Sequence, residues 1–132
     1  MYSHKIRVRY AETDAMAVAH HSSYWLWFEE ARVEFLNTNN INYSDLEKQG
    51  FFLPVAESYC KYLTPAHFNE VLIVNCFVTK IGGASVKIEY EIINEKNQNV
   101  AKAYTVHPIV NEQGHIVKMP EKIKKEFQKI LE

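Results

Sequence analysis

The sequence contains only two cysteines among 132 residues, and their positions match neither a disulfide framework nor a metal motif. Cys60 and Cys76 both lie in segments with strand-like patterning, so we expect two buried free thiols. The scattered histidines show no metal-ligand spacing either. We therefore expect no disulfide-stabilised secreted domain, no metal and no cofactor bound as a permanent part of the protein.

The sequence also lacks an excess of charge of either sign, with 15 Lys+Arg against 16 Asp+Glu. A nucleic-acid-binding domain needs a strongly basic surface or stripe, so we expect no nucleic-acid partner. No apolar run approaches the roughly 20 residues that cross a bilayer, and we expect no membrane partner. The start, Met1–Lys5, has no apolar core of a signal peptide, which leads us to expect a cytoplasmic protein.

The apolar residues are plentiful, at 47% hydrophobic and 13% aromatic, which is enough for the core of one domain spanning residues 1–132. Aromatic residues are also enriched where subunits meet. The generous aromatic share therefore leads us to expect surface that is buried in a subunit interface.

The first third of the chain predicts a strand, a loop and a long helix. Residues 4–10 alternate apolar and polar side chains, which is typical of a half-buried strand. After a loop, Ser22 or Ser23 is expected to cap a helix over 24–37. This helix is apolar on most sides, so we expect it to be central and buried.

The rest of the chain predicts an antiparallel sheet. Alternation is clearest over 84–93, which follows a Gly82-Gly83 turn. Pro120 is expected to open a C-terminal helix with Ile123, Phe127, Ile130 and Leu131 on one face. A sheet wrapped around the central helix satisfies both patterns, so we predict an α+β fold. The other expected elements are a helical turn over 43–49, strands over 52–63, 70–81 and 100–110, and a short strand over 115–118.

The segment from Arg9 to Tyr24 concentrates polar chemistry, because it places acids and two adjacent histidines in the loop before the helix. A helix N-terminus offers unpaired backbone N–H groups and a partial positive charge, which can stabilise an oxyanion. A nearby carboxylate such as Asp14 can act as a nucleophile or as a base for water. Spacing alone leaves a second interpretation open, a loop-capping aspartate beside solvated histidines.

Motifs along nearly the whole chain favour the catalytic interpretation of Asp14. They are Tyr10-x-x-Thr13-Asp14, then Val18, His21 and Tyr24, then Trp27-x-Glu29-x-Ala31-Arg32-x-Glu34, Tyr62-Leu63-x-Pro65-Ala66 and Gly82-Gly83-x-Ser85. With them the sequence resembles the hotdog-fold thioesterases related to 4-hydroxybenzoyl-CoA thioesterase and the YbgC-type acyl-CoA thioesterases. The resemblance implies a hotdog fold, a sheet wrapped around a long helix, and hydrolysis of an acyl-CoA substrate to a free acid and coenzyme A.

The resemblance also assigns roles to residues. It makes Asp14 the catalytic carboxylate and His21 the residue whose backbone N–H polarises the thioester carbonyl. Coenzyme A would belong to the substrate. Relatives build their active sites at a subunit interface, so the resemblance implies a homodimer or homotetramer. The expected substrate-binding residues are Tyr24, Ala17, Val18 and Trp27 at the acyl group, with Lys80, Gly82, Gly83 and Ser85 at the coenzyme.

Three positions need separate comment. Family members usually carry glycine where this chain has Ala17, and glycine would permit a positive φ or close approach of the backbone to substrate. Glu12, where many relatives have aspartate, is read as structural. Glu29 and Arg32, spaced i,i+3 on the helix, are expected to form a surface or interface ion pair.

Two other functions stay open. One is a hotdog enzyme that acts on carrier-bound substrates, either an acyl-ACP thioesterase or a dehydratase. The other is a non-catalytic acyl-CoA-binding module, which the exchange of glycine for Ala17 favours and the presence of Asp14 opposes. The identity of the acyl group does not follow from these residues.

Overall fold

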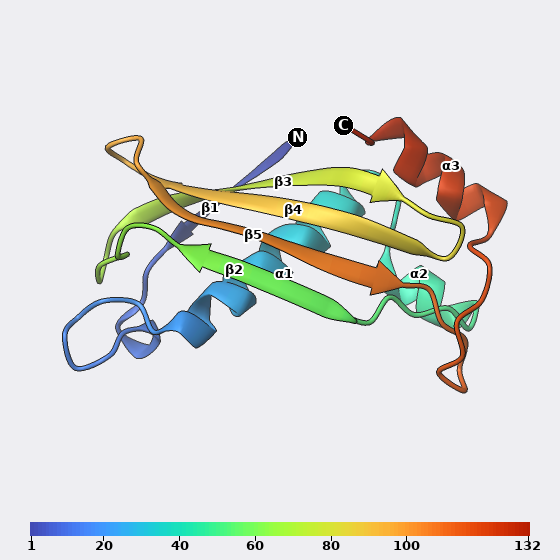
Figure 1. Cartoon of the computed structure of the whole chain (residues 1–132), viewed down its shortest axis with the longest axis horizontal. Helices are drawn as coiled ribbons and strands as arrows, with labels where there is room; N and C mark the ends of the chain where they lie inside the picture. Colours follow the sequence, from blue (N-terminus) through green and yellow to red (C-terminus); the bar gives the residue numbers. More distant parts are fainter.

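The computed structural model describes residues 1–132 and joins one five-stranded antiparallel sheet to three α-helices (Figure 1). The predicted arrangement of a long helix against an antiparallel sheet is therefore what the chain forms. Its elements are β1 (Tyr2–Arg7), a 3₁₀ turn (Tyr10–Glu12), α1 (His21–Asn37), α2 (Tyr43–Lys48), β2 (Glu57–Tyr62), β3 (Val71–Ile81), β4 (Ser85–Asn94), β5 (Asn99–Pro108) and α3 (Glu121–Lys129).

The strands follow the spatial order β1-β3-β4-β5-β2, so β1 and β2 form the two edges of the sheet. The long helix α1 runs along one face of this sheet, and α3 lies at the end where β3 turns into β4 (Figure 1). The loop between β1 and α1 lies at the opposite end, next to the end of β2. No helix in the structure has the length and apolar character needed to cross a membrane.

The core lies between α1 and the inner face of the sheet. Side chains alternate along β3 and β4, and the inward-facing ones, such as Val74 and Ile88, are at most 1% exposed. From α1, Phe28 and Phe35 pack against this face, with Phe28 in contact with the Tyr90 ring at a centroid distance of 4.7 Å. Each fully buried aliphatic or aromatic side chain contributes about 1.5–3 kcal/mol, which explains why the predicted apolar helix is held in this place.

Several predicted boundaries were wrong. The helix begins at His21 with His20 as its N-cap, and neither Ser22 nor Ser23 serves as the cap. The strand predicted over 52–63 is continuous only over 57–62, with Phe52 in a separate bridge to Val110. Residues 115–118 form a single bridge, Ile116 to Val110, in place of a strand. Leu131 lies beyond α3 and is 46% exposed, because the chain turns there to pair with the end of β3.

Two side chains also differ from expectation. Cys76 is buried as predicted, but Cys60 on the edge strand β2 is only half-buried. Arg32 does not pair with Glu29 on the surface. It points into the core, where its guanidinium donates hydrogen bonds to the hydroxyls of Tyr43 and Tyr90, both at 3.1 Å. Burying the long stem of arginine, with its polar head hydrogen-bonded, explains this inward orientation.

Candidate active site

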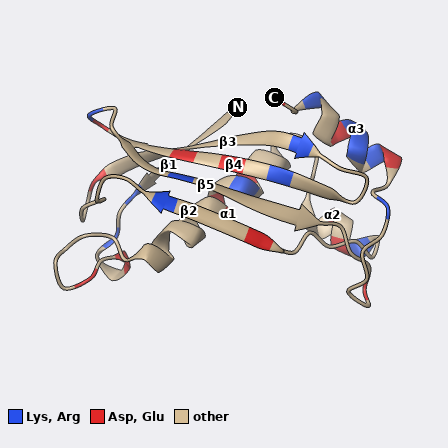
Figure 2. Ribbon diagram, viewed as in Figure 1, with Lys and Arg blue, Asp and Glu red and all other residues tan.

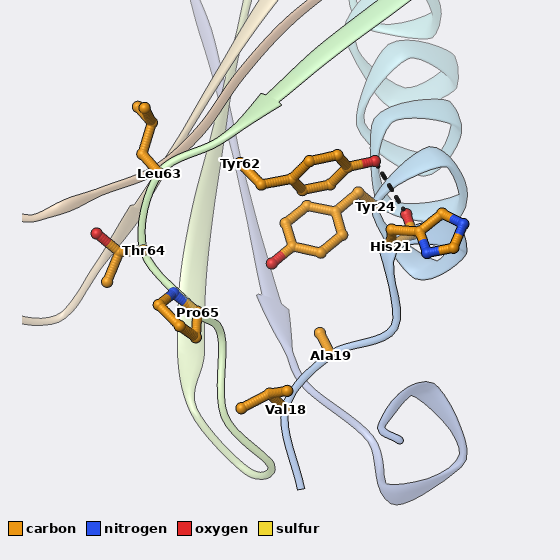
Figure 3. Close-up of a pocket in the computed structure, with 8 residues that line it drawn as sticks. All are labelled: Val18, Ala19, His21, Tyr24, Tyr62, Leu63, Thr64 and Pro65. Atoms are coloured by element: carbon orange, nitrogen blue, oxygen red, sulfur yellow. Dashed lines mark hydrogen bonds between the residues drawn. The ribbon is translucent and has the colours of Figure 1, made fainter. Parts of the chain in front are cut away.

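A cavity of about 340 Å³ opens where α1 begins and β2 ends. Figure 3 shows two segments facing one another across it, the loop entering α1 and the chain that follows β2, with the rings of Tyr24 and Tyr62 between them. The cavity is lined by Val18, Ala19, His21, Tyr24, Tyr62, Leu63, Thr64 and Pro65.

Asp14 lies in the loop that forms one wall of this cavity. Its backbone N–H donates to the carbonyl of Val18 at 2.9 Å, so Asp14 lies beside a residue that lines the cavity. One carboxylate oxygen accepts the backbone N–H of Met16 at 2.8 Å, which fixes the side-chain orientation. The side chain is otherwise exposed, and its second oxygen has no protein donor. A carboxylate held in this way keeps an oxygen free to accept a proton or attack a carbonyl.

Ala17 takes the backbone conformation that favours glycine, with φ at +62°. Its N–H donates to the Asp14 carbonyl at 3.1 Å, and its own carbonyl accepts the N–H of Phe68 at 3.1 Å. A left-handed conformation costs an L-residue about 1–2 kcal/mol, so Ala17 stores strain in the turn that carries Asp14. Ala17 thus takes the positive φ that a glycine at this position was expected to permit.

Glu12 fastens this loop to the helix, as the structural interpretation of this residue predicted. Its buried carboxylate accepts the Arg9 backbone N–H at 2.7 Å and the Trp27 indole N–H at 2.8 Å. Burial alone would raise the pKa of Glu12, but these bonds and the Arg9 guanidinium outweigh it, and the pKa is lowered. Its backbone carbonyl accepts both the His20 N–H at 2.8 Å and the buried Ser23 hydroxyl at 2.9 Å.

Of the residues expected at the acyl group, Tyr24 and Val18 line the cavity, whereas Ala17 and Trp27 do not. Trp27 is 2% exposed and does not line the cavity of Figure 3. Its ring packs under Tyr24 at a centroid distance of 4.9 Å. In the isolated chain, Trp27 supports the pocket wall and the Asp14 loop from beneath.

The first turn of α1 leaves one backbone donor open at the cavity. The N–H of Ser22 is bonded to the His20 side chain and that of Ser23 to the His20 carbonyl, whereas the N–H of His21 has no protein acceptor. The His21 carbonyl receives the Tyr62 hydroxyl at 3.4 Å, a long bond drawn in Figure 3. Because the positive end of the helix dipole coincides with this free donor, an oxyanion would be stabilised here.

Two tyrosines form the apolar wall of the cavity. The rings of Tyr24 and Tyr62 meet edge to face at a centroid distance of 4.8 Å. Burial raises the pKa of Tyr24, and burial together with the nearby Cys60 raises the pKa of Tyr62 to about 12. Both phenols are therefore protonated at neutral pH. The Tyr62 hydroxyl donates to the His21 carbonyl, which leaves the Tyr24 hydroxyl as the donor for a bound ligand.

The residues expected at the coenzyme lie far from this cavity within one chain. Lys80, Gly82, Gly83 and Ser85 form the β3–β4 turn, at the opposite end of the molecule from the Asp14 loop (Figure 1). The turn is tight, since the Gly82 N–H donates to the Ser85 carbonyl at 2.7 Å. Basic residues colour the end of β3 and much of α3 near this turn in Figure 2.

The structure adds pocket residues that sequence reasoning did not assign to the site. Ala19, Tyr62, Leu63, Thr64 and Pro65 line the cavity, although three of them stood in a motif that carried the family resemblance. The available signal was that motif, which places an aromatic residue and a proline where a strand ends. Spacing did not show that this segment meets the Asp14 loop, because the two are far apart in sequence and join only through contacts such as the Ala19 N–H to the Ala66 carbonyl at 2.7 Å.

An open backbone N–H at a helix start thus lies at an aromatic-walled cavity, and the Asp14 carboxylate lies in the adjoining loop, outside the lining. Together these groups can attack a carbonyl, or activate water to do so, and can stabilise the oxyanion that results. No group of three or more His, Cys, Asp or Glu side chains lies together in the geometry of a metal site.

Comparison with known proteins connects this geometry to a family. A family model described as the thioesterase-like superfamily matches residues 8–127. The putative acyl-CoA thioesterase YneP of Bacillus subtilis is 32% identical over 110 residues, which cover 83% of this chain and 80% of that protein.

Solved structures give the same result. A hypothetical protein from Thermus thermophilus superimposes with a TM-score of 0.93 at 32% identity, over 98% of this chain and 99% of the other. The DHNA-CoA thioesterase from Staphylococcus aureus superimposes with a TM-score of 0.92 at 28% identity, over 98% of this chain and 89% of the other. The α+β architecture is accordingly the expected hotdog fold, and the chain belongs to the thioesterase-like superfamily.

Proposed function

We propose that this protein hydrolyses acyl-CoA thioesters to a carboxylic acid and coenzyme A, with Asp14 as general base or nucleophile. The observation that carries the proposal is the unbonded His21 N–H at the start of α1, on the rim of the cavity and on the wall that the Asp14 loop leads into. Relatives named as acyl-CoA thioesterases, including YneP, support the choice of substrate.

The chemistry of a thioester suits such a site. If Asp14 acts as base, it takes a proton from water while the water oxygen attacks the acyl carbon. The carbonyl oxygen becomes an oxyanion, which accepts a hydrogen bond from the His21 N–H. Collapse of this intermediate breaks the C–S bond and expels the coenzyme A thiolate, which then takes up a proton. If Asp14 attacks directly, the same thiolate leaves an acyl-aspartyl anhydride, and water then hydrolyses it.

The apolar part of the substrate would lie along the aromatic wall. Tyr24 is 3% exposed and presents its ring at the base of the cavity, while Tyr62 remains 45% exposed at its mouth. In Figure 3 the Tyr24 hydroxyl points toward Pro65, so the cavity has a polar donor at one end of an otherwise apolar surface. An acyl group of moderate size fits the volume of about 340 Å³.

We further propose that two copies of the chain build each complete site. The edge strand β2 has no second strand beside it, and Tyr59 and Tyr62 on it are 50% and 45% exposed. An unpaired edge with exposed aromatic side chains is a template for pairing. If β2 pairs antiparallel with β2 of a second copy, the far end of the partner's sheet comes beside this chain's Tyr62. That arrangement would bring the β3–β4 turn, with Lys80 and Ser85, toward the pocket mouth and the coenzyme.

The first experiment measures coenzyme A release from aliphatic and aromatic acyl-CoAs by wild type, Asp14→Asn and Asp45→Asn. Asp45 is the only other aspartate, is exposed on α2, and serves as the matched control. We expect hydrolysis by wild type and Asp45→Asn, with a loss of at least about 100-fold in Asp14→Asn. Equal rates in all three proteins would refute the role of Asp14.

The other functions predict different results in the same assay. Acyl-CoA binding without turnover by wild type would identify a binding module, whereas hydrolysis of acyl-ACP alone would identify a carrier-dependent enzyme. A shared site is tested by mixing subunits of Asp14→Asn with subunits of Lys80→Glu, after each is shown to be impaired alone. Random exchange in a dimer should restore up to about a quarter of wild-type activity, because half of the dimers gain one intact site. No restoration on exchange would place both residues in sites built by one chain.

A further inference from the structure

His20 makes contacts at the entrance of α1 that neither the sequence nor the proposed reaction assigned to it. Its backbone is extended, with φ −68° and ψ 141°, as in an N-cap residue. Its imidazole Nδ1 accepts the Ser22 backbone N–H at 3.2 Å and lies 2.8 Å from the Ser22 hydroxyl. The side chain thus satisfies one of the helix N–H groups that have no partner within the helix.

The backbone of His20 is held as firmly as its side chain. Its N–H donates to the Glu12 carbonyl at 2.8 Å, and its own carbonyl accepts the Ser23 N–H at 2.9 Å. His20 therefore ties the Asp14 loop, through Glu12, to the first turn of α1. Of the N–H groups of residues 21–23, only that of His21 remains unbonded.

The hydrogen-bond pattern sets the tautomer of the His20 ring. Nδ1 can accept the Ser22 N–H only through its lone pair, so the ring proton must lie on Nε2. The Ser22 hydroxyl then donates to the same lone pair. The ring also lies against that of His21 at a centroid distance of 4.2 Å, which restricts how His21 can move.

Histidine is an uncommon choice for this task, since Ser, Thr, Asp and Asn are the preferred N-cap residues. We propose that His20 is a positioning residue for the thioesterase reaction: its Nδ1 caps α1 and holds the first turn so that the His21 N–H is the donor presented to the thioester carbonyl. This inference rests on the proposed function. His20 is not expected to touch the reacting atoms.

The test uses two variants that differ only in capping ability. In His20→Asn the side chain retains an acceptor for the Ser22 N–H, and in His20→Leu it does not. His115→Leu supplies the control for loss of an exposed imidazole, because the His115 side chain makes no hydrogen bond and lies in the turn after β5. For each variant, kcat and KM are measured on the best acyl-CoA, and amide hydrogen exchange is measured at Ser22.

We expect His20→Leu to lower kcat by about 10- to 100-fold while KM changes by less than about 3-fold, because the bound carbonyl would meet a displaced donor. Exchange at the Ser22 amide should accelerate in the same variant. His20→Asn should restore both quantities to near the wild-type values, and His115→Leu should leave both unchanged.

Two results would overturn the inference while leaving the proposed function intact. One is a wild-type kcat in His20→Leu, and the other is equal loss in His20→Leu and His20→Asn, which would show that the imidazole itself is needed. If wild type hydrolyses no acyl-CoA at all, the proposed function fails and this inference fails with it. A loss seen only in KM would place His20 in substrate binding and would also contradict a positioning role.

Discussion

The two ends of α1 differ in how their terminal backbone groups are hydrogen-bonded. At the C-terminal end, the Phe35 carbonyl accepts the Thr38 hydroxyl at 2.9 Å and the Asn39 side-chain amide at 2.8 Å, and the Leu36 carbonyl accepts the Ile41 N–H at 2.9 Å. At the N-terminal end, the His21 N–H has no acceptor, although the loop before it is well ordered by hydrogen bonds. The last carbonyls of α1 thus have side-chain and backbone donors, whereas the His21 N–H at the other end keeps its hydrogen-bonding capacity free.

The C-terminal half of α1 also anchors a closed polar network in the core. Arg32 donates to the Tyr90 hydroxyl at 3.1 Å, Tyr90 is 2.7 Å from Thr105, and Thr105 is 2.7 Å from His107 Nε2. His107 Nδ1 reaches the Leu53 carbonyl at 3.3 Å. Since arginine only donates and a carbonyl only accepts, the donors run in one direction from Arg32 to Leu53. This half of the helix therefore contributes a hydrogen-bonded network to the core, whereas the first turn of the helix lies at the cavity.

The largest difference between the two ends is expected when a buried side chain near the C-terminal end of α1 is truncated, which should change stability but not activity. Leu36 is 1% exposed, so Leu36→Ala should lower the free energy of unfolding by about 2–5 kcal/mol through lost contacts and a cavity. Its kcat, measured below the unfolding transition, should match wild type. Leu26→Ala is the control, because Leu26 is 57% exposed on the same helix and should cost less than about 0.5 kcal/mol. A large drop in kcat for Leu36→Ala would mean that the two ends are coupled.

The polar network should give stability a dependence on pH. Burial, and then the charge of Arg32, lower the pKa of His107 from 6.5 to about 4. Between about pH 6.5 and 4, His107 is protonated in the unfolded chain but neutral in the folded protein. The free energy of unfolding therefore decreases as pH falls through this range. By pH 4.5 this group should remove about 2–3 kcal/mol from the free energy of unfolding. Denaturant titrations at several pH values give the free energy of unfolding of wild type and of His107→Gln. If this free energy changed with pH by the same amount in both proteins, His107 would be excluded as the cause.

The smallest effect concerns the strained turn at the open end. Ala17→Gly should raise the free energy of unfolding by up to about 1 kcal/mol, because relief of the positive φ exceeds the extra entropy of glycine in the unfolded chain. Ala17→Val should lower it by about 1 kcal/mol or more, since a β-branched residue fits this conformation poorly. Thermal unfolding measures both variants. If Ala17→Gly destabilised the protein by as much as Ala17→Val, strain at φ +62° would not be the reason.

Predictions that rested on a local pattern succeeded, whereas those that depended on contacts with other segments failed. Period-2 alternation identified β4 almost to the residue, with 84–93 predicted and Ser85–Asn94 found. Apolar and polar side chains alternate along this strand, and that pattern alone shows which side chains face the core. The start of α1 was misplaced because Ser22 and Ser23 are better N-cap residues than His20. Hydrogen bonds from His20 and Ser23 to the Glu12 carbonyl, across the loop before the helix, override that preference. Arg32 was misplaced for the same kind of reason, since its partners Tyr43 and Tyr90 lie on other elements.

The sequence likewise predicted one part of the candidate site, whereas the other part depends on the tertiary structure. The sequence alone determined that an acid and two histidines precede a long apolar helix, and motif resemblance extended this to a thioesterase loop around Asp14. It could not determine that the chain after β2 forms the other wall, because Tyr62 meets Tyr24 only when the edge strand packs beside the helix start. It also did not show that Lys80 and Ser85 lie at the far end of the sheet. Local patterns fix the elements because they act between near neighbours, whereas the cavity and its open donor arise only when the sheet order brings distant segments together.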